Sequence, residues 1–218
     1  MVMPWIMDLG SRSQILRGVS LIVGEGLCSN IYVVGGDQVV IVDAGVGNHA
    51  NPIWPQLGQL GVESRSIAGL VLTHAHHDHA MGVFTIFERV EPTVYVHRLD
   101  LKLIASDLGP NLVSLEEGDI VPTDLWPLEV IWTPGHTEGS ICLYARQPGI
   151  LFSGDTIFPD GYFGRYDGET GSYNSLKKSL QRLSEMKVQV MLPGHGMPVL
   201  KDAQKHVIMS YRNASLFA

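Results

Sequence analysis

Residues Thr73 to His79 read Thr-His-Ala-His-His-Asp-His, which places four histidines and one aspartate within seven positions. The apolar run Gly69 to Leu72 comes directly before them and predicts a buried strand that ends where the polar cluster begins. Loops at the carboxyl ends of strands are where α/β folds place their chemistry. Histidine and carboxylate together suit zinc, iron or manganese, and at this short spacing we expect the ligands to converge from a curled loop rather than from one face of a helix.

The spacing within this segment indicates two half-sites. His74 and His76 could ligate one ion, and Asp78 and His79 a neighbouring one, with His77 as a spacer that points away. Two half-sites need further ligands, and three later segments each carry His or Asp directly after Gly at the end of an apolar run. The segments are Thr133–Ser140 with His136, Phe152–Thr156 with Asp155, and Leu192–Gly196 with His195.

The order of these four segments resembles the metallo-β-lactamase superfamily and, within it, the glyoxalase II-like hydrolases, from about Gly18 to the last predicted helix. The resemblance implies two divalent ions, expected to be zinc with iron or manganese as alternatives. The implied ligands are His74, His76 and His136 for one ion, Asp78, His79 and His195 for the other, and Asp155 as the bridge between them.

The resemblance also implies the reaction. A metal-bridging hydroxide would attack the carbonyl of a thioester or ester, as in a hydroxyacylglutathione hydrolase, since two divalent ions lower the pKa of bound water towards roughly 7. Asp78 is expected to be catalytic as well as a ligand, because it could also move a proton. Thr137 and Ser140 are expected to hold the His136 loop by local hydrogen bonds.

An internal repetition agrees with the fold that the resemblance implies. Val40–Asp43 followed by Leu70–His74 has the same order, strand then Asp and strand then His, as Leu151–Asp155 followed by Val190–His195. We expect an α/β fold, a four-layer αβ/βα sandwich (the metallo-β-lactamase fold) with pseudo-two-fold halves and the metals at the seam. Because 218 residues suffice for one sizeable α/β domain but not for two, we expect a single metallo-β-lactamase-like domain over residues 1–218.

Apolar runs and turn residues predict the elements, and residues 1–17 carry little periodic signal. Besides the strand before Thr73, strands are expected at Leu16–Val23, Ile31–Val34, Val39–Val42, Thr93–Val96, Asp119–Val121, Leu128–Trp132, Ile141–Ala145, Ile150–Phe152 and Val188–Leu192. Helices are expected at Pro52–Leu60, Ala80–Val90, Leu99–Ser106, Ser172–Met186 and Asp202–Leu216.

Asp43 directly follows the apolar run Val39–Val42, and a buried carboxylate is costly without a partner. In the family that the chain resembles, this aspartate lies under the metal site. We therefore expect Asp43 to orient a ligand histidine or to support the metal loop.

Phe158 to Tyr173 is rich in aromatic residues and glycine, follows Asp155, and could overhang the metals as a recognition loop. Tyr162, Arg165 and Tyr166 are the candidate substrate contacts within it. The Gly-Arg pair that includes Arg165 resembles a pair in glyoxalase-like proteins, where it is more often structural. His49, His97 and His206 belong to no motif, and we expect them to be surface or locally hydrogen-bonded residues.

Other functions remain open from the sequence. A mononuclear iron oxygenase acting on persulfide sulfur would use His74, His76 or their counterparts with Asp155, and leave the second site empty. A lactonase would use the same binuclear centre, and a non-catalytic metal-binding module could be built on the same fold. No Gly-x-Ser-x-Gly motif is present, which makes a covalent acyl-enzyme the weaker mechanism. Chains of full glyoxalase II type continue into a helical region that helps to hold glutathione, whereas this sequence ends at Ala218.

The formal charge is -7, from 15 basic and 22 acidic residues, which disfavours nucleic acid and anionic membranes as partners. A small-molecule substrate is expected, and a homo-oligomer remains open. No run approaches the roughly 18 apolar residues that span a bilayer. The N-terminus has an early proline and no basic region, so we expect no secretory signal and a cytoplasmic protein. Cys28 and Cys142 are expected to be buried thiols in a reducing compartment.

Overall fold

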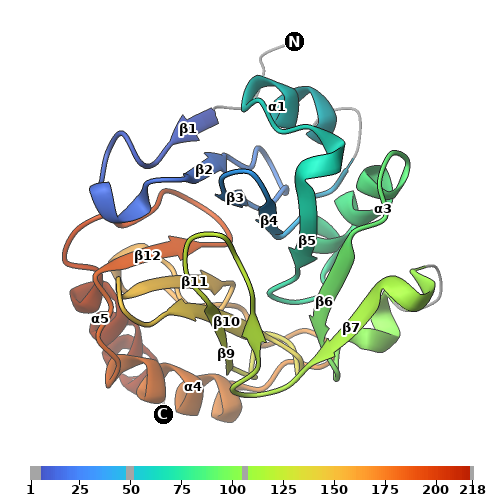
Figure 1. Ribbon diagram of the computed structural model, residues 1–218. Coiled ribbons are helices and arrows are strands. Elements are labelled where there is room, and N and C mark those ends of the chain that lie inside the picture. Colours follow the sequence, from blue (N-terminus) through green and yellow to red (C-terminus); the bar gives the residue numbers. More distant parts are fainter. Residues whose placement is uncertain (1–5, 48–51, 105–107, 217–218) are drawn as a thin grey trace.

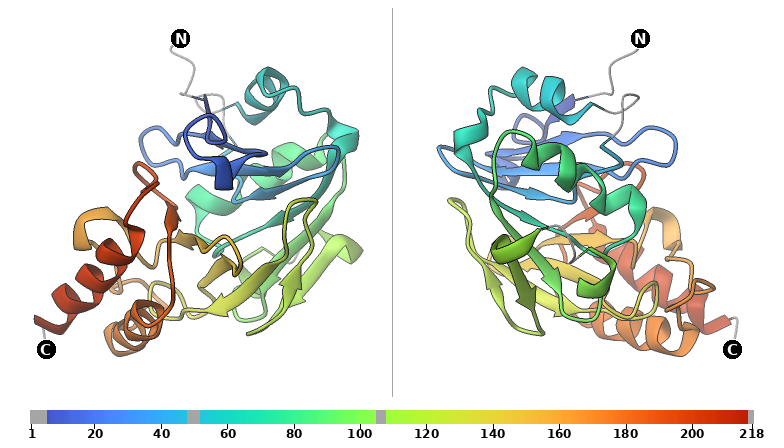
Figure 2. Two further views of the ribbon diagram at one scale, coloured as in Figure 1. Left: turned by 60° about the vertical axis from the view of Figure 1, so that its left-hand side comes forward. Right: turned by 90° about the vertical axis from the view of Figure 1, so that its right-hand side faces the viewer.

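The computed structural model describes residues 6–47, 52–104 and 108–216. Two sheets lie face to face, and helices cover the outer face of each one (Figures 1 and 2). The expected four-layer αβ/βα sandwich is confirmed.

The first sheet has seven strands, whose spatial order follows the chain: β1 (Ile6–Asp8), β2 (Val19–Ile22), β3 (Ile31–Gly35), β4 (Val39–Val42), β5 (Ile67–Val71), β6 (Thr93–His97) and β7 (Leu112–Leu115). The second sheet has five, in the spatial order β12 (Val190–Pro193), β11 (Ile150–Gly154), β10 (Ile141–Ala145), β9 (Leu128–Trp132) and β8 (Ile120–Val121). The helices are α1 (Ile53–Gln59), α2 (His77–Ala80), α3 (Gly82–Phe87), α4 (Tyr173–Ser184) and α5 (Ala203–Leu216).

The central strands are buried on both faces, because each sheet lies between its partner sheet and a layer of helices. In β4, Val40 and Val42 belong to the core between the sheets, while Val39 and Ile41 pack in the core beneath α1 and α3. In the second sheet, Phe152 belongs to the core between the sheets and its neighbour Leu151 packs beneath α4 and α5. Burial on both faces explains why these strands are unbroken apolar runs rather than alternations of apolar and polar residues.

Each sheet contains the same arrangement of four consecutive strands. β2, β3 and β4 pair antiparallel, and β4 then pairs parallel with β5 after the crossover through α1. β9, β10 and β11 also pair antiparallel, and β11 pairs parallel with β12 after the crossover through α4. This repeated topology agrees with the expected pseudo-two-fold relation. The carboxyl ends of the two parallel pairs meet at the seam, where Thr73 O accepts a hydrogen bond from Ile141 N at 2.8 Å.

The expected helix Ala80–Val90 is confirmed over α3, but the helical segment begins earlier, with α2, and a break at Met81 divides it into two short helices. The amide of Gly82 donates to the carbonyl of Gly45 at 2.9 Å instead of continuing the helix. A Cβ on Gly82 would lie 1.8 Å from the carbonyl oxygen of Ala44. The close packing of this turn against the loop after β4 therefore requires glycine and ends α2 early.

Three further expectations differ from the structure. The strand expected from Leu16 begins only at Val19, because a 3-10 turn covers Gln14–Leu16 and Gly18 follows with a φ of 83°. The helix expected at Leu99–Ser106 is a 3-10 turn at Leu101–Leu103, and Ser106 lies outside the described residues. Strands β1 and β7 were not expected; they are edge strands of three and four residues, too short to give a clear alternation.

Cys28 and Cys142 are free and buried, as expected. Burial raises the pKa of Cys28, and it raises the pKa of Cys142 to about 11, so both are thiols at neutral pH. Within the described ranges, no helix is long and apolar enough to cross a membrane.

Candidate metal centre

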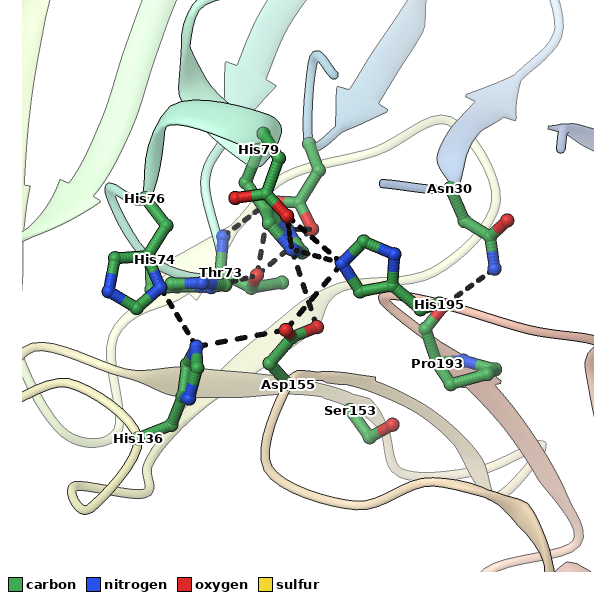
Figure 3. A network of polar contacts seen from close by, with 12 residues as sticks. Asn30, Thr73, His74, His76, His79, His136, Ser153, Asp155, Pro193 and His195 are labelled. Carbon is green, nitrogen blue, oxygen red and sulfur yellow. Dashed lines mark hydrogen bonds and ion pairs between the residues drawn. The ribbon is translucent and has the colours of Figure 1, made fainter. Parts of the chain in front are cut away.

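The seven candidate metal ligands come together at the seam between the two sheets (Figure 3). They arrive from both halves of the chain: His74 and His76 from the segment after β5, Asp78 and His79 from α2, His136 from the β9–β10 loop, and Asp155 and His195 from the ends of β11 and β12. The expectation of a curled loop is corrected for Asp78 and His79, which lie on the single helical turn of α2. His77 is exposed on that turn, as expected of a spacer.

The ligand atoms form three overlapping groups in which all atoms lie within 4.8 Å of one another. The groups are His74 with His76 and His136, His74 with His79 and Asp155, and Asp78 with His79 and His195. The first and third groups contain the same residues as the two ligand sets that the resemblance implies. Their role as ligands remains a proposal.

Asp155 lies between the two sets. Its Oδ2 is 3.7 Å from Nε2 of His136 and 3.6 Å from Nε2 of His195. Its Oδ1 is 3.3 Å from Nε2 of His79. These separations are close to the roughly 3.3 Å expected between two ligand atoms that share a tetrahedral ion at 2.0–2.1 Å. One carboxylate is thus placed to contact ions on either side.

Contacts to Nδ1, on the side of each ring that faces away from the centre, fix the orientation of three histidines. Nδ1 of His79 contacts Oδ2 of Asp43 at 2.9 Å, and Nδ1 of His136 contacts the carbonyl oxygen of Arg165 at 2.8 Å. Nδ1 of His74 lies 3.1 Å from Oγ1 of Thr73, which itself donates to Asp43. A ring that donates through Nδ1 presents the lone pair of Nε2 to the centre, which is the tautomer that a metal ion requires. Nε2 of His74 is buried and has no hydrogen-bond partner, so this lone pair is free.

The protonation states of His74, Asp78 and Asp155 fit metal binding. Burial and the neighbouring histidines, His79 first, hold the pKa of His74 well below its usual value, so its ring is neutral. Burial raises the pKa of Asp78, but the hydrogen bond with His195 and the charge of His79 outweigh it and lower the pKa to about 2. Burial likewise raises the pKa of Asp155, and the charge of His79 reverses this to a net lowering. Burial lowers the pKa of His79, but the charges of Asp43 and Asp155 outweigh it and raise this pKa well above its usual value. Neutral imidazole and ionised carboxylate are the forms that bind metal ions, so His79 would release a proton on metal binding.

The backbone leaves room for the centre at Gly194. A Cβ at this position would lie 2.2 Å from Oδ1 of Asp155 and 2.7 Å from Cε1 of His79. Glycine is therefore needed for the ligands to converge. With the free lone pair of His74 and the ionised carboxylates, the residues present fit divalent metal ions.

Asp43 was expected to support the centre, and the structure gives this buried carboxylate three donors. Besides His79, it accepts hydrogen bonds from Thr73 N at 2.8 Å and from Thr73 Oγ1 at 2.9 Å. Asp43 adopts a φ of 57°, in the left-handed region that Asp and Asn tolerate better than most residues. Its carboxylate thereby contacts both the segment after β5 and α2 beneath the histidines.

Two residues that hold the ligand loops escaped the sequence reasoning. Asp100 is buried and accepts hydrogen bonds from Ala75 N, Thr137 Oγ1 and Gly139 N, each at 3.0 Å. It thus joins the His74–His76 segment to the His136 loop. Asn30 donates from Nδ2 to the carbonyl of Pro193 at 2.9 Å (Figure 3) and to that of Gly196 at 2.8 Å, and these two residues flank the segment with His195. An acid three residues after the end of β6 was the available signal for Asp100.

Replacing Asp100 by asparagine should weaken metal binding without abolishing folding. An amide cannot accept all three hydrogen bonds, and each buried donor left without a partner costs about 1–3 kcal/mol. Loss of residues that orient ligands typically lowers metal affinity by about 10–100-fold. Titration with zinc in the presence of a competing chelator would measure this. An Asp100→Asn protein with the affinity of the wild type would show that the two loops hold their positions without this carboxylate.

The three candidate substrate contacts occupy different places. Tyr162 is exposed and lines a cavity beside His195. Arg165 lines a second cavity, next to His136 and Asp155, but its guanidinium is paired with Asp167 at 3.0 Å. Tyr166 lines neither of these two cavities and its ring packs against Tyr173, with the ring centroids 5.0 Å apart. A substrate role for any of them remains a prediction.

The histidines outside the motifs make local contacts. His97 is buried and its ring stacks on Trp132, with the centroids 5.5 Å apart. Nδ1 of His206 accepts a hydrogen bond from Asp160 N at 2.9 Å. His49 lies outside the described residues. Thr137 and Ser140 join their hydroxyls at 2.8 Å, which fits their expected role in holding the His136 loop.

A sandwich of two mixed sheets with histidine and aspartate side chains gathered at its seam defines a class of metal-binding α/β proteins. Residues 23–195 match the family profile described as the Metallo-beta-lactamase superfamily. The chain therefore belongs to this superfamily of hydrolases. The resemblance stated from the motifs is confirmed.

Relatives and solved structures agree with this assignment. The chain is 30% identical over 192 residues to a probable metallo-hydrolase of Methanocaldococcus jannaschii, a match that covers 79% of this chain and 90% of the relative. It is 32% identical over 158 residues to a hydroxyacylglutathione hydrolase of Chromohalobacter salexigens, covering 69% of this chain and 53% of that relative, so it spans about half of that enzyme's length. The structure of TTHA1623 in a di-iron-bound form matches with a TM-score of 0.70 and 28% identity, over 88% of this chain and 96% of that chain.

Proposed function

We propose that the protein is a binuclear metal-dependent hydrolase that cleaves thioesters. The observation that carries the proposal is the position of Asp155, whose carboxylate approaches His136 on one side and His79 and His195 on the other. This placement suits a pair of ions better than a single one. The similarity to a hydroxyacylglutathione hydrolase supports a thioester substrate.

Divalent ions at such a site supply a nucleophile by lowering the pKa of water, and they polarise a carbonyl oxygen. The chain's own residues would bind and orient the reactants around them. Water adds to the acyl carbon, the carbon–sulfur bond breaks, and the departing thiolate takes up a proton. Asp78 is placed to move that proton, because its carboxylate lies on the open side of the centre and is 28% exposed.

We propose zinc as the native metal, with iron or manganese as alternatives. Imidazole and carboxylate bind all three ions. The di-iron form of TTHA1623 keeps iron open as an alternative for this chain. We also propose a cytoplasmic location, in keeping with two free cysteines.

Metal content and substrate preference should be measured on one preparation. Protein purified without added metal would be submitted to elemental analysis and assayed on acyl thioesters, lactones and glutathione persulfide. We expect two divalent ions per chain and a kcat/KM on at least one thioester of about 10⁴ M⁻¹ s⁻¹ or more.

The other results would each overturn a defined part of the proposal. One iron per chain with oxygen consumption on the persulfide would assign an oxygenase instead. If the protein held two ions but hydrolysed only lactones, the binuclear centre would stand and the proposed thioester substrate would be wrong. Two ions with no turnover on any substrate would leave a metal-binding module.

A further inference from the structure

An apolar cavity of about 830 Å³ opens beside the metal centre. One wall comes from the loop after β11, including Phe158, Tyr162 and Phe163, and the opposite wall from the segment after β12, including Met197 and Leu200. The candidate ligand His195 belongs to the same lining, and the centroid of its ring lies 6.4 Å from that of Phe158. The cavity is within the size range of small-molecule sites, about 300–1,000 Å³.

Hydrogen bonds hold both walls in place. The β11 loop closes on itself through Phe158 N and the carbonyl of Tyr162 at 2.9 Å. It is tied to α5 by Ser210 Oγ, which donates to the carbonyl of Tyr162 at 2.8 Å. The other wall is tied to β12, where Met191 and Val199 exchange two hydrogen bonds at 2.9 Å. The cavity is therefore formed before any ligand arrives, which lowers the entropic cost of binding.

The lining carries no lysine or arginine. Its ionisable side chains are Asp160, His195, His206 and the phenol of Tyr162, and Nδ1 of His206 lies 3.5 Å from Oδ1 of Asp160. A ligand with carboxylates, such as glutathione, would find no lysine or arginine here and would approach an acidic group. An uncharged apolar group would instead cover Tyr162 and Met197, which are exposed to water.

A second cavity, of about 350 Å³, is polar and does not include His195 in its lining. It is lined by Asp78, Asp155 and the Arg165–Asp167 pair, among others. Nε2 of His195, which lines the apolar cavity, lies 3.1 Å from Oδ2 of Asp78, which lines the polar one, so the two cavities adjoin at the centre. The carrier thiols of thioesters are polar and form many hydrogen bonds. Their acyl groups are the part that an apolar cavity can hold.

We propose that the cavity between the β11 loop and the segment after β12 binds an apolar acyl chain, so that the substrate is a medium- or long-chain acyl thioester rather than a hydroxyacyl-glutathione. This inference rests on the proposed thioesterase activity and specifies the substrate class of the same site. The acyl carbon would lie at the metal centre and the carrier thiol in the polar cavity.

The test varies the acyl chain while the thiol stays constant. Thioesters of N-acetylcysteamine, from acetyl to decanoyl, would be compared with S-lactoylglutathione. Each methylene that enters the cavity should raise kcat/KM by about two- to fourfold, the factor that corresponds to burial of a CH₂ group. Equilibrium binding of the decyl thioether of N-acetylcysteamine, which cannot be hydrolysed, would be followed by calorimetry as a readout that does not need turnover.

Met197→Asp places a charge on the cavity wall, and Ile120→Asp is the matched control. The two residues are 52% and 53% exposed, and Ile120 lies on β8. A carboxylate beside an apolar chain is costly, so we expect the decanoyl-to-acetyl ratio of kcat/KM and the affinity for the decyl thioether to fall at least tenfold in Met197→Asp. Neither should change in Ile120→Asp. Thermal unfolding of both variants would establish that they are folded.

The outcomes separate this inference from the proposed function. Hydrolysis of all thioesters without dependence on chain length would overturn the acyl cavity and keep the thioesterase. Binding of the decyl thioether that depends on Met197, without cleavage of any thioester, would support the cavity and reject the proposed reaction. A wild-type dimer that Met197→Asp converts to a monomer in sedimentation would show that a second copy of the chain covers this face, and the inference would fall.

Discussion

The Asp155→Ala protein should hold at most one metal ion per chain and lose at least about 100-fold in kcat/KM. Removing a residue that only orients a ligand already lowers metal affinity by about 10–100-fold. Asp155 is itself a candidate ligand, so its loss should have a larger effect. Its carboxylate is the group that approaches both histidine sets, at 3.7 Å from His136 and 3.6 Å from His195. Without it, the remaining imidazoles would face two adjacent cations with one negative charge fewer. Elemental analysis and initial rates on the same preparation would measure both effects.

Asp167→Ala is the matched control for this variant. Asp167 lines the same polar cavity as Asp155, but its carboxylate is exposed and paired with Arg165 rather than with a candidate ligand. We expect this protein to retain the metal content of the wild type. Full metal content and turnover in Asp155→Ala would end the binuclear proposal, because the centre would then hold both ions without the residue that joins its two sets.

The motifs, together with the superfamily that they resemble, were sufficient to predict which side chains meet. A metal ligand must carry a suitable donor atom, which limits the candidates to a few residue types. The turn that follows a strand determines where along the edge of the sheet the candidate lies. His74 and Asp155 each follow a strand buried on both faces, and such strands are evident as apolar runs. The seam between the sheets could therefore be located from the four strand ends.

The residues that hold these ligands could not be predicted in the same way. Asp100 acts on Ala75, Thr137 and Gly139, which lie 25, 37 and 39 residues away. Asn30 reaches the carbonyl of Pro193 across 163 residues. Contacts at such separations depend on how the loops pack in three dimensions, and local periodicity contains no information about them. The end of α2 could not be predicted from local sequence either. The group that excludes a side chain at position 82 is the carbonyl of Ala44, which belongs to another loop.

Substitution of Asp43 should lower both metal affinity and the free energy of unfolding. In Asp43→Asn the amide can accept fewer of the hydrogen bonds from Thr73 and His79, and it removes the negative charge beside the His79 ring at 2.9 Å. Breaking a buried charged pair from one side costs about 3–5 kcal/mol. As a metal ligand His79 is neutral, and its ring would lose the partner that selects the tautomer, so zinc affinity should fall by about 10–100-fold. Denaturation in urea and zinc titration with a competing chelator would measure the two effects separately.

Asp202 provides the control that separates charge from backbone strain, because it has the same φ of 57° but an exposed carboxylate paired with Lys205. Asparagine tolerates the left-handed region whereas alanine is strained there by about 1–2 kcal/mol. Asp202→Ala should therefore cost roughly this strain alone, and Asp202→Asn almost nothing. If Asp43→Asn proved as harmless as Asp202→Asn while Asp43→Ala matched Asp202→Ala, the Asp43 carboxylate would have no effect on the centre and only the turn would matter. A loss in Asp43→Asn that exceeds the Asp202→Ala loss would assign the effect to the carboxylate beneath His79.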